Sequence, residues 1–251
     1  MEPKPGRHAP RFDRSTLTLF QQLDHTAQRY ILVGDVHGQL AALNTLLETL
    51  VFNPTTDQVI FLGDMVNKGP DSKGVLKRAR EIGARCIRGN HEDFLYSLYQ
   101  DFQNGSTRAW GNDLIKLVKD MDEADWEYLD SCALVLKIPL EVGNVIAVHA
   151  GMDTSVSIKK QDPDHAMYIP YLRRKTAPYK YYDAPKDWQN KWAQKHSPDG
   201  PVVVYGHDEY DRAAIMPMTK GIDTTCRKGG KLTAIVYPGG KIRDVQCTAP
   251  E

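Results

Sequence analysis

The chain has 251 residues, of which 41% are hydrophobic and 25% are charged, which is the composition of an ordinary globular protein with one large domain or two small ones. Lysine plus arginine equals aspartate plus glutamate, at 32 each. This balance excludes a global positive field that would attract a polyanion such as DNA, so any attraction for phosphate must be local.

The start of the chain is rich in proline and charge and has no apolar core like that of a signal peptide. We expect residues 1–28 to be a flexible tail and lead-in, followed by one domain over residues 29–251. No run of about 18 apolar residues is present, so we expect no membrane span. A signal or anchor removed from the native protein would leave no trace here.

The four cysteines, Cys86, Cys132, Cys226 and Cys247, are scattered and form no Cys-x-x-Cys pair. This spacing argues against a zinc ribbon and against a disulfide framework. We therefore expect a reduced, cytoplasmic environment, with a vacuolar location as the alternative.

The first part of the domain alternates short apolar runs with stretches that carry an apolar stripe at helical spacing. In chain order these are the strand Arg29–Val33, a helix over 39–50, the strand Val59–Leu62, a helix over Lys73–Ile82, the strand 85–87 and a helix containing Phe94, Leu98 and Phe102. Alternation of this kind predicts a parallel sheet with right-handed crossovers.

The pattern changes after the third helix. Two short helices are expected over Leu114–Met121 and Asp125–Cys132, then a hairpin of strands 134–140 and 145–148, the strand Val202–Val204 and a C-terminal hairpin with a Pro-Gly-Gly turn. Residues 153–200 are polar and aromatic with no clear period, and we interpret them as an insertion on the substrate side. No internal repeat or linker divides the chain.

Five of the apolar runs end beside glycine in side chains that can bind a metal ion. These side chains are Asp35 with His37, Asp64, Asn90, His149 and His207. A single Gly-Asp after a strand is usually a turn, and a lone histidine there is more often structural. Five strand ends of the right types in one chain instead indicate a shared site. Six carboxylate, amide and imidazole ligands suit two ions of Mn, Fe, Zn or Co, with Asp64 as the bridge.

The motifs GDVHG (34–38), GDMVNKG (63–69), GNHE (89–92), VHAG (148–151) and GH (206–207) resemble those of the calcineurin-like metallophosphoesterases, in the phosphoprotein phosphatase branch. The stretches 63–72 and 222–234 are most similar to the ApaH-like phosphatases. The resemblance covers about residues 29–245. It implies an α/β sandwich of mixed sheets flanked by helices, which replaces the purely parallel sheet.

The resemblance also implies roles for the site residues. One ion would be held by Asp35, His37 and Asp64, and the other by Asp64, Asn90, His149 and His207. A hydroxide between the two ions would attack phosphorus, and His91 would protonate the leaving oxygen. Lys68, Asn90 and a further arginine would hold the phosphoryl oxygens; the candidates are Arg88, which alternatively braces its loop, and Arg173 or Arg174 in the insertion.

The chain departs from the wider branch at Asn67 and Lys68, where the branch has an aspartate that orients the catalytic histidine and an arginine that grips phosphate. An amide carries no charge, so His91 should be less basic than usual. An ammonium is a point charge and not a bidentate fork. This departure is a feature of the ApaH-like group, and it weakens the expectation of a phosphoprotein substrate.

We therefore expect a two-metal phosphohydrolase that prefers phosphoanhydrides, either inorganic polyphosphate or nucleoside polyphosphates. Basic residues among the aromatics of the insertion could hold a nucleotide or a polyphosphate chain, although the aromatics could instead cover the sandwich. The alternatives are a phosphoserine/threonine phosphatase and a metal-binding scaffold that recognises phosphate without turnover.

Overall fold

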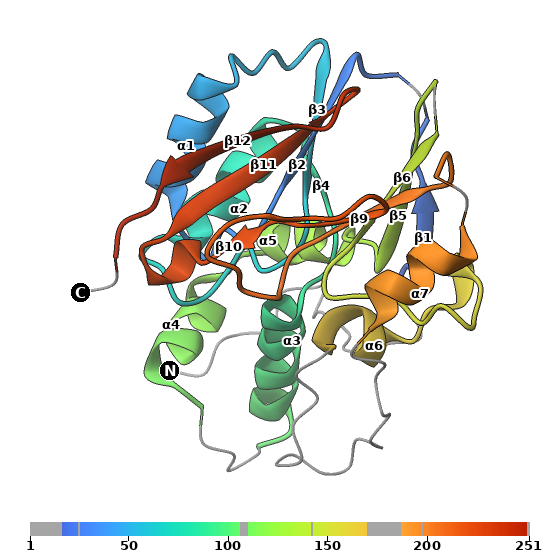
Figure 1. Ribbon diagram of the computed structural model, residues 1–251. Coiled ribbons are helices and arrows are strands. Elements are labelled where there is room, and N and C mark those ends of the chain that lie inside the picture. The colour runs from blue at the N-terminus through green and yellow to red at the C-terminus, as the bar shows by residue number, and fades with distance from the viewer. Residues whose placement is uncertain are drawn as a thin grey trace.

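The computed structural model describes residues 17–24, 26–105, 110–141, 143–169, 187–196 and 198–249. Two mixed β-sheets pack face to face, and helices cover their outer faces (Figure 1). This is the α/β sandwich that the motifs implied. The strand–helix alternation alone was misleading, because it sampled only the parallel part of one sheet.

Each sheet has six strands. The first runs in the order β1 (Phe20–Gln22), β5 (Val135–Pro139), β6 (Asn144–Val148), β7 (Val202–Tyr205), β9 (Thr219–Gly221) and β8 (Ala214–Ile215). The second runs β10 (Asp223–Thr224), β11 (Lys231–Tyr237), β2 (Arg29–Val33), β3 (Asp57–Phe61) and β4 (Arg85–Cys86), with β12 (Lys241–Gln246) paired to β11. Both hairpins predicted from the sequence are present, as β5–β6 and β11–β12.

Helices α1 and α2 lie beside the second sheet, and α6 and α7 lie beside the first (Figure 1). The α-helices are α1 (Leu40–Thr49), α2 (Ser72–Glu81), α3 (Asn90–Gln103), α4 (Asn112–Asp120), α5 (Glu123–Asp130), α6 (Pro163–Tyr168) and α7 (Trp188–Lys195). Short 3₁₀ helices are η2 (Ile158–Lys160) and η3 (Cys226–Lys228). None of the helices in the described ranges is long and apolar enough to cross a membrane.

Each central strand divides its side chains between the core that separates the two sheets and the core under the helices on its outer face. On β2, Tyr30 and Leu32 pack between the sheets, whereas Ile31 and Val33 pack against the helices. Successive side chains of a strand point to opposite faces, so a strand covered on both sides is apolar throughout. This is why the strands near the centre of each sheet appear in the sequence as continuous apolar runs.

The carboxyl ends of the central strands meet at one edge of the sandwich. Strands β2, β3 and β4 run parallel, as do β6 and β7 in the other sheet. Parallel strands end at the same edge, so the loops that follow them converge there. The ring of His149, after β6, hydrogen-bonds to the carbonyl of Leu62, after β3, and this contact joins the two edges at 2.8 Å.

The N-terminal lead-in is more ordered than expected. Residues 20–22 form β1, which pairs in parallel with β5, and the flanking Leu17 and Leu23 are buried. The strand is too short to give a periodic signal in the sequence. The rest of the predicted tail, residues 1–16, lies outside the described residues.

The expectation that the cysteines are unpaired is wrong. Cys86 is bonded to Cys132 and Cys226 to Cys247, at sequence separations of 46 and 21 residues. Sequence spacing could not reveal these pairs, because the fold and not a local motif brings their strands and helices together. The expected reduced, cytoplasmic environment loses its main support, since structural disulfides are rare in the cytosol.

Within the insertion, Trp188 and Trp192 of α7 are buried against the first sheet. These two aromatics therefore cover the sandwich, which was the alternative to a role in binding a nucleotide.

Candidate metal centre

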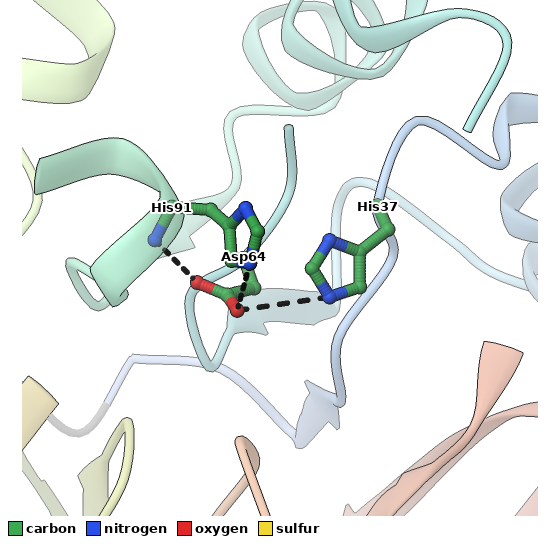
Figure 2. Close-up of side chains that lie close together, drawn as sticks. All are labelled: His37, Asp64 and His91. Atoms are coloured by element: carbon green, nitrogen blue, oxygen red, sulfur yellow. Dashed lines mark hydrogen bonds and ion pairs between the residues drawn. The ribbon is translucent and has the colours of Figure 1, made fainter. Parts of the chain in front are cut away.

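Asp64 lies at the centre of the converging loops (Figure 2). Its Oδ1 accepts a hydrogen bond from the backbone N–H of His91 at 2.9 Å and lies 3.4 Å from Nε2 of His149. Its Oδ2 lies 3.6 Å from Nε2 of His37 and 3.8 Å from Nε2 of His91. One carboxylate thus faces His149 with one oxygen, and His37 and His91 with the other.

Hydrogen bonds at the other ring nitrogen orient two of these imidazoles. Nδ1 of His37 lies 3.2 Å from the carbonyl oxygen of Val66, and Nδ1 of His149 lies 2.8 Å from that of Leu62. A carbonyl accepts only, so each Nδ1 carries the proton and each Nε2 presents a lone pair toward Asp64. This backbone support is the arrangement that orients metal-ligating histidines.

A second group of acceptors meets around His149. Its Nε2 lies 3.0 Å from Oδ1 of Asn90 and 3.1 Å from Nδ1 of His207. The backbone N–H of His207 donates to both carboxylate oxygens of Asp35, each at 3.1 Å. All six predicted ligands are therefore brought to one place.

The backbone at three of the six predicted ligands is in the left-handed region. His37, Asp64 and His207 have φ of 46°, 50° and 62°. Such angles are uncommon for residues with a side chain and persist where the surrounding structure fixes them, typically at functional sites. A Cβ on Gly206 would lie 2.0 Å from Oδ1 of Asp35, so only glycine fits there.

Glu92 holds two of the ligand loops together, and sequence reasoning missed this role. Its fully buried carboxylate accepts hydrogen bonds from the backbone N–H groups of Asp64, Met65 and Gly89, each at 2.8 Å. The loops after β3 and β4 are thereby tied to the start of α3. Its place three residues after the glycine that caps α3 was the available signal.

The protonation preferences of the site fit divalent cations. Burial lowers the pKa of His37 and of His207 to about 4, so both rings are neutral near pH 7. Burial raises the pKa of Asp35 and of Asp64 well above the usual range, and neighbouring carboxylates raise it further. Clustered buried carboxylates are costly without a compensating charge, and neutral imidazoles cannot supply it. Divalent cations bound by these oxygen and nitrogen atoms would supply that charge.

His91 and Asn67 form a direct pair. Oδ1 of Asn67 accepts a hydrogen bond from the backbone N–H of Lys68 at 2.8 Å, which turns the amide nitrogen toward Nδ1 of His91, also at 2.8 Å. The amide nitrogen only donates, so Nδ1 accepts and the neutral ring carries its proton on Nε2. His91, His37 and Asp64 lie close enough to share an ion, within 4.8 Å, but a protonated Nε2 is a hydrogen-bond donor and not a ligand.

Of the other residues predicted to contact phosphate, the structure places Lys68 at the site and turns Arg88 away from it. Lys68 is exposed beside the site. Arg88 is buried and turned toward α3 and α5, where it donates to the carbonyl of Leu129 at 3.0 Å and stacks on the Tyr96 ring at 4.3 Å. These contacts favour bracing of the loop. Arg173 and Arg174 lie outside the described residues.

The sequence profile of the calcineurin-like phosphoesterase family matches residues 28–237. A symmetrical bis(5'-nucleosyl)-tetraphosphatase of Erwinia tasmaniensis is 39% identical over 94 residues, which are 37% of this chain and 34% of the relative. The chain therefore spans about a third of the first curated relatives that it matches, 34% and 33%. An asymmetrical bis(5'-nucleosyl)-tetraphosphatase, PrpE, of Oceanobacillus iheyensis is 27% identical over 246 residues, covering 87% of this chain and 92% of the relative.

A crystal structure presented as that of a candidate diadenosine tetraphosphatase superposes with a TM-score of 0.75 at 31% identity, covering 92% of this chain and 99% of that one. A cold-active protein-tyrosine phosphatase of a Shewanella species superposes with a TM-score of 0.55 at 14% identity, which shows the shared fold alone.

Proposed function

Because the chain belongs to the calcineurin-like phosphoesterase family, we propose that it is a metal-dependent hydrolase of phosphoanhydrides, with nucleoside polyphosphates or inorganic polyphosphate as substrates. Relatives named bis(5'-nucleosyl)-tetraphosphatases support the class of bond. The observation that carries the preference for anhydrides is the contact between Asn67 and His91.

In this proposal Asp35, His37 and Asp64 hold one divalent ion, and Asp64, Asn90, His149 and His207 hold the other. Ions at these positions supply charge neutralisation at the phosphoryl oxygens and a nucleophile at neutral pH. The chain itself contributes rigid placement of the ligands, through Glu92 and the two carbonyl-bound imidazoles. Positioning and charge account for most of the catalysis in phosphoryl transfer.

His91 acts on the leaving group. With Nδ1 engaged by the Asn67 amide, its Nε2–H donates a hydrogen bond to the departing oxygen. Burial lowers the pKa of His91 well below its ordinary value, and the nearby His37 and Lys68 lower it further. The ring is therefore mostly neutral at pH 7, and an imidazolium that could transfer a proton is rare. A leaving phosphate needs little help from a proton, whereas a serine or threonine alkoxide needs much. The site is accordingly better matched to an anhydride than to a phosphoprotein.

Lys68 would meet the phosphate chain as a point charge. A compact ammonium is less demanding of geometry than a guanidinium fork and can sit beside an internal phosphate. Any contribution of Arg173 or Arg174 in the insertion would add to it.

The test is kcat/KM for a panel of substrates with Mn, Zn, Fe or Co added singly. The panel holds diadenosine tetraphosphate, tripolyphosphate, a cap analogue, a phosphoserine peptide and para-nitrophenyl phosphate. We expect anhydrides to be cleaved at least about tenfold better than the phosphopeptide. A preference for the phosphopeptide would support the protein phosphatase alternative, and no turnover with any metal would support the scaffold.

The His91→Ala variant separates binding of metal from chemistry. It should retain metal, since Nε2–H is not a ligand, and its rate should fall by about 10²–10⁴-fold on a substrate that needs the donor. The loss should be smaller for para-nitrophenyl phosphate, whose leaving group needs no proton. A His91→Ala protein that binds no metal would show that His91 is a ligand after all.

A further inference from the structure

Residues 222–230 form a segment that begins beside the loop that bears Asp35. A Cβ on Gly34 would lie 2.5 Å from the carbonyl oxygen of Ile222, which immediately precedes β10. After β10 the segment carries η3, which contains Arg227 and Lys228. Thr225 then takes a left-handed backbone, with φ of 63°, and turns the chain into η3.

An ion pair links Arg227 to the loop that follows β7 and bears His207. Its Nε lies 2.7 Å from Oε1 of Glu209, and Nζ of Lys228 lies 2.5 Å from Oε2 of the same carboxylate. Glu209 comes two residues after the predicted ligand His207. The side chain of Arg227 is 32% exposed, and within the described ranges it makes no other hydrogen bond or ion pair. A guanidinium has five N–H donors, so one ion pair leaves donors for a ligand.

Arg227 and Lys68 come from different loops that border the predicted metal site. Lys68 follows Asn67, whose amide contacts His91, and Arg227 pairs with Glu209, two residues after His207.

We infer that Arg227, held by Glu209, binds the phosphate groups of the substrate that lie beyond the bond being cut, and so selects chains of phosphates over single phosphoryl groups. This inference rests on the proposed function. The chain has a lysine at position 68, where the wider family has a forked arginine, and Arg227 supplies a planar fork from another loop. Glu209 is a positioning residue, because it acts only through the guanidinium.

The first experiment compares kcat/KM on diadenosine tetraphosphate and on para-nitrophenyl phosphate for Arg227→Gln, Arg227→Lys and Glu209→Gln. Lys231→Gln is the matched control, because Lys231 pairs with Asp244 at 2.8 Å between β11 and β12 and has no place in the site. Ionic strength is held constant, since exposed charges are screened by salt.

For Arg227→Gln we expect kcat/KM on the tetraphosphate to fall by about 10- to 100-fold, as for the loss of one or two charge-assisted hydrogen bonds. The loss on para-nitrophenyl phosphate should be at least about tenfold smaller than this. Arg227→Lys should recover part of the lost kcat/KM on the tetraphosphate. Glu209→Gln should lower kcat/KM on the tetraphosphate in the same way as Arg227→Gln, but by a smaller factor. Equal losses on both substrates, or a loss no greater than that of Lys231→Gln, would overturn the inference.

A binding measurement separates failure of this inference from failure of the proposed function. Titration calorimetry on the metal-loaded protein compares the β,γ-methylene analogue of ATP with orthophosphate. Arg227→Gln should weaken binding of the analogue by about tenfold and weaken orthophosphate much less. If the wild type hydrolyses nothing but shows this pattern, the inference stands and the proposed reaction fails. If the analogue binds equally to wild type and variant, or does not bind to the wild type, the inference fails.

Discussion

The pairing of Asn67 with His91 leads to a prediction about a single atom, since Asn67→Asp replaces an amide nitrogen by an oxygen. The amide now donates to Nδ1 at 2.8 Å, which keeps that nitrogen unprotonated. A carboxylate oxygen there would accept from a protonated Nδ1 and would stabilise the imidazolium form. The variant should therefore turn His91 from a hydrogen-bond donor into a proton donor.

The size of the effect follows from the contact. A hydrogen bond to a charged partner contributes about 1.5–3 kcal/mol, against about 1 kcal/mol for a neutral one. The imidazolium form should gain about 1–2 kcal/mol, which is roughly a 5- to 30-fold change in its population. The pKa of His91, which burial lowers, should rise accordingly. Cleavage of a phosphoserine peptide should speed up by a similar factor, and cleavage of diadenosine tetraphosphate should change by less than about threefold.

The assay is kcat/KM on both substrates from pH 5 to pH 9 for the wild type, Asn67→Asp and Asn67→Asp with Lys68→Arg. The double variant restores both features of the wider family and should move the ratio furthest toward the phosphopeptide. If the ratio of kcat/KM on the two substrates stays the same in both variants, or if the wild type already prefers the phosphopeptide, Asn67 does not control proton donation by His91.

Three further predictions concern stability. Glu92→Gln leaves at least one of three buried backbone N–H groups without an acceptor, so the free energy of unfolding in urea should fall by about 2–3 kcal/mol. A fall below about 0.5 kcal/mol would show that Glu92 does not hold the two loops together. Cys132→Ala opens a disulfide that closes 46 residues and should cost about 4 kcal/mol by chain entropy, measured without reductant; equal stability in the two proteins would argue against that bond. Burial raises the pKa of Asp223 to about 6, so in metal-free protein its stabilising contribution is present below pH 4 and is lost as the pH rises through 6. Asp223→Asn should therefore gain about 3 kcal/mol on the wild type between pH 4 and pH 7, and a constant difference across that range would contradict the assignment.

The predicted ligands could be found in the sequence because they follow strands that are apolar on both faces. Asp64 and His149 each follow such a run, and parallel strands must end at a common edge. The resemblance in motifs then replaced the expected parallel sheet with a sandwich of mixed sheets. The alternation of strands and helices could not predict this, because the pairings of β7 with β9 and of β11 with β2 join segments that no local sequence pattern connects.

What the sequence concealed depended on contacts between distant residues. The position of Arg88 directly before the motif at residues 89–92 suggested a phosphate contact. Its guanidinium instead donates to Leu129, 41 residues away in α5, and to Tyr96 in α3. The disulfide of Cys86 with Cys132 was hidden for the same reason. Arg227 follows a strand of two residues, too short to predict, and only the fold brings it to the ligand loops.

In the proposed function, two divalent ions bound around Asp64 support hydrolysis of an anhydride. The most direct measurement is the rate of diadenosine tetraphosphate cleavage against bound Mn²⁺ per chain, obtained by adding Mn²⁺ to chelator-treated protein and determining both quantities in the same samples. We expect no cleavage without metal and a rate that rises until about two equivalents are bound, as for two-ion catalysis. Full activity in metal-free protein, or a rate that reaches its maximum with one equivalent bound, would show that catalysis does not depend on two ions.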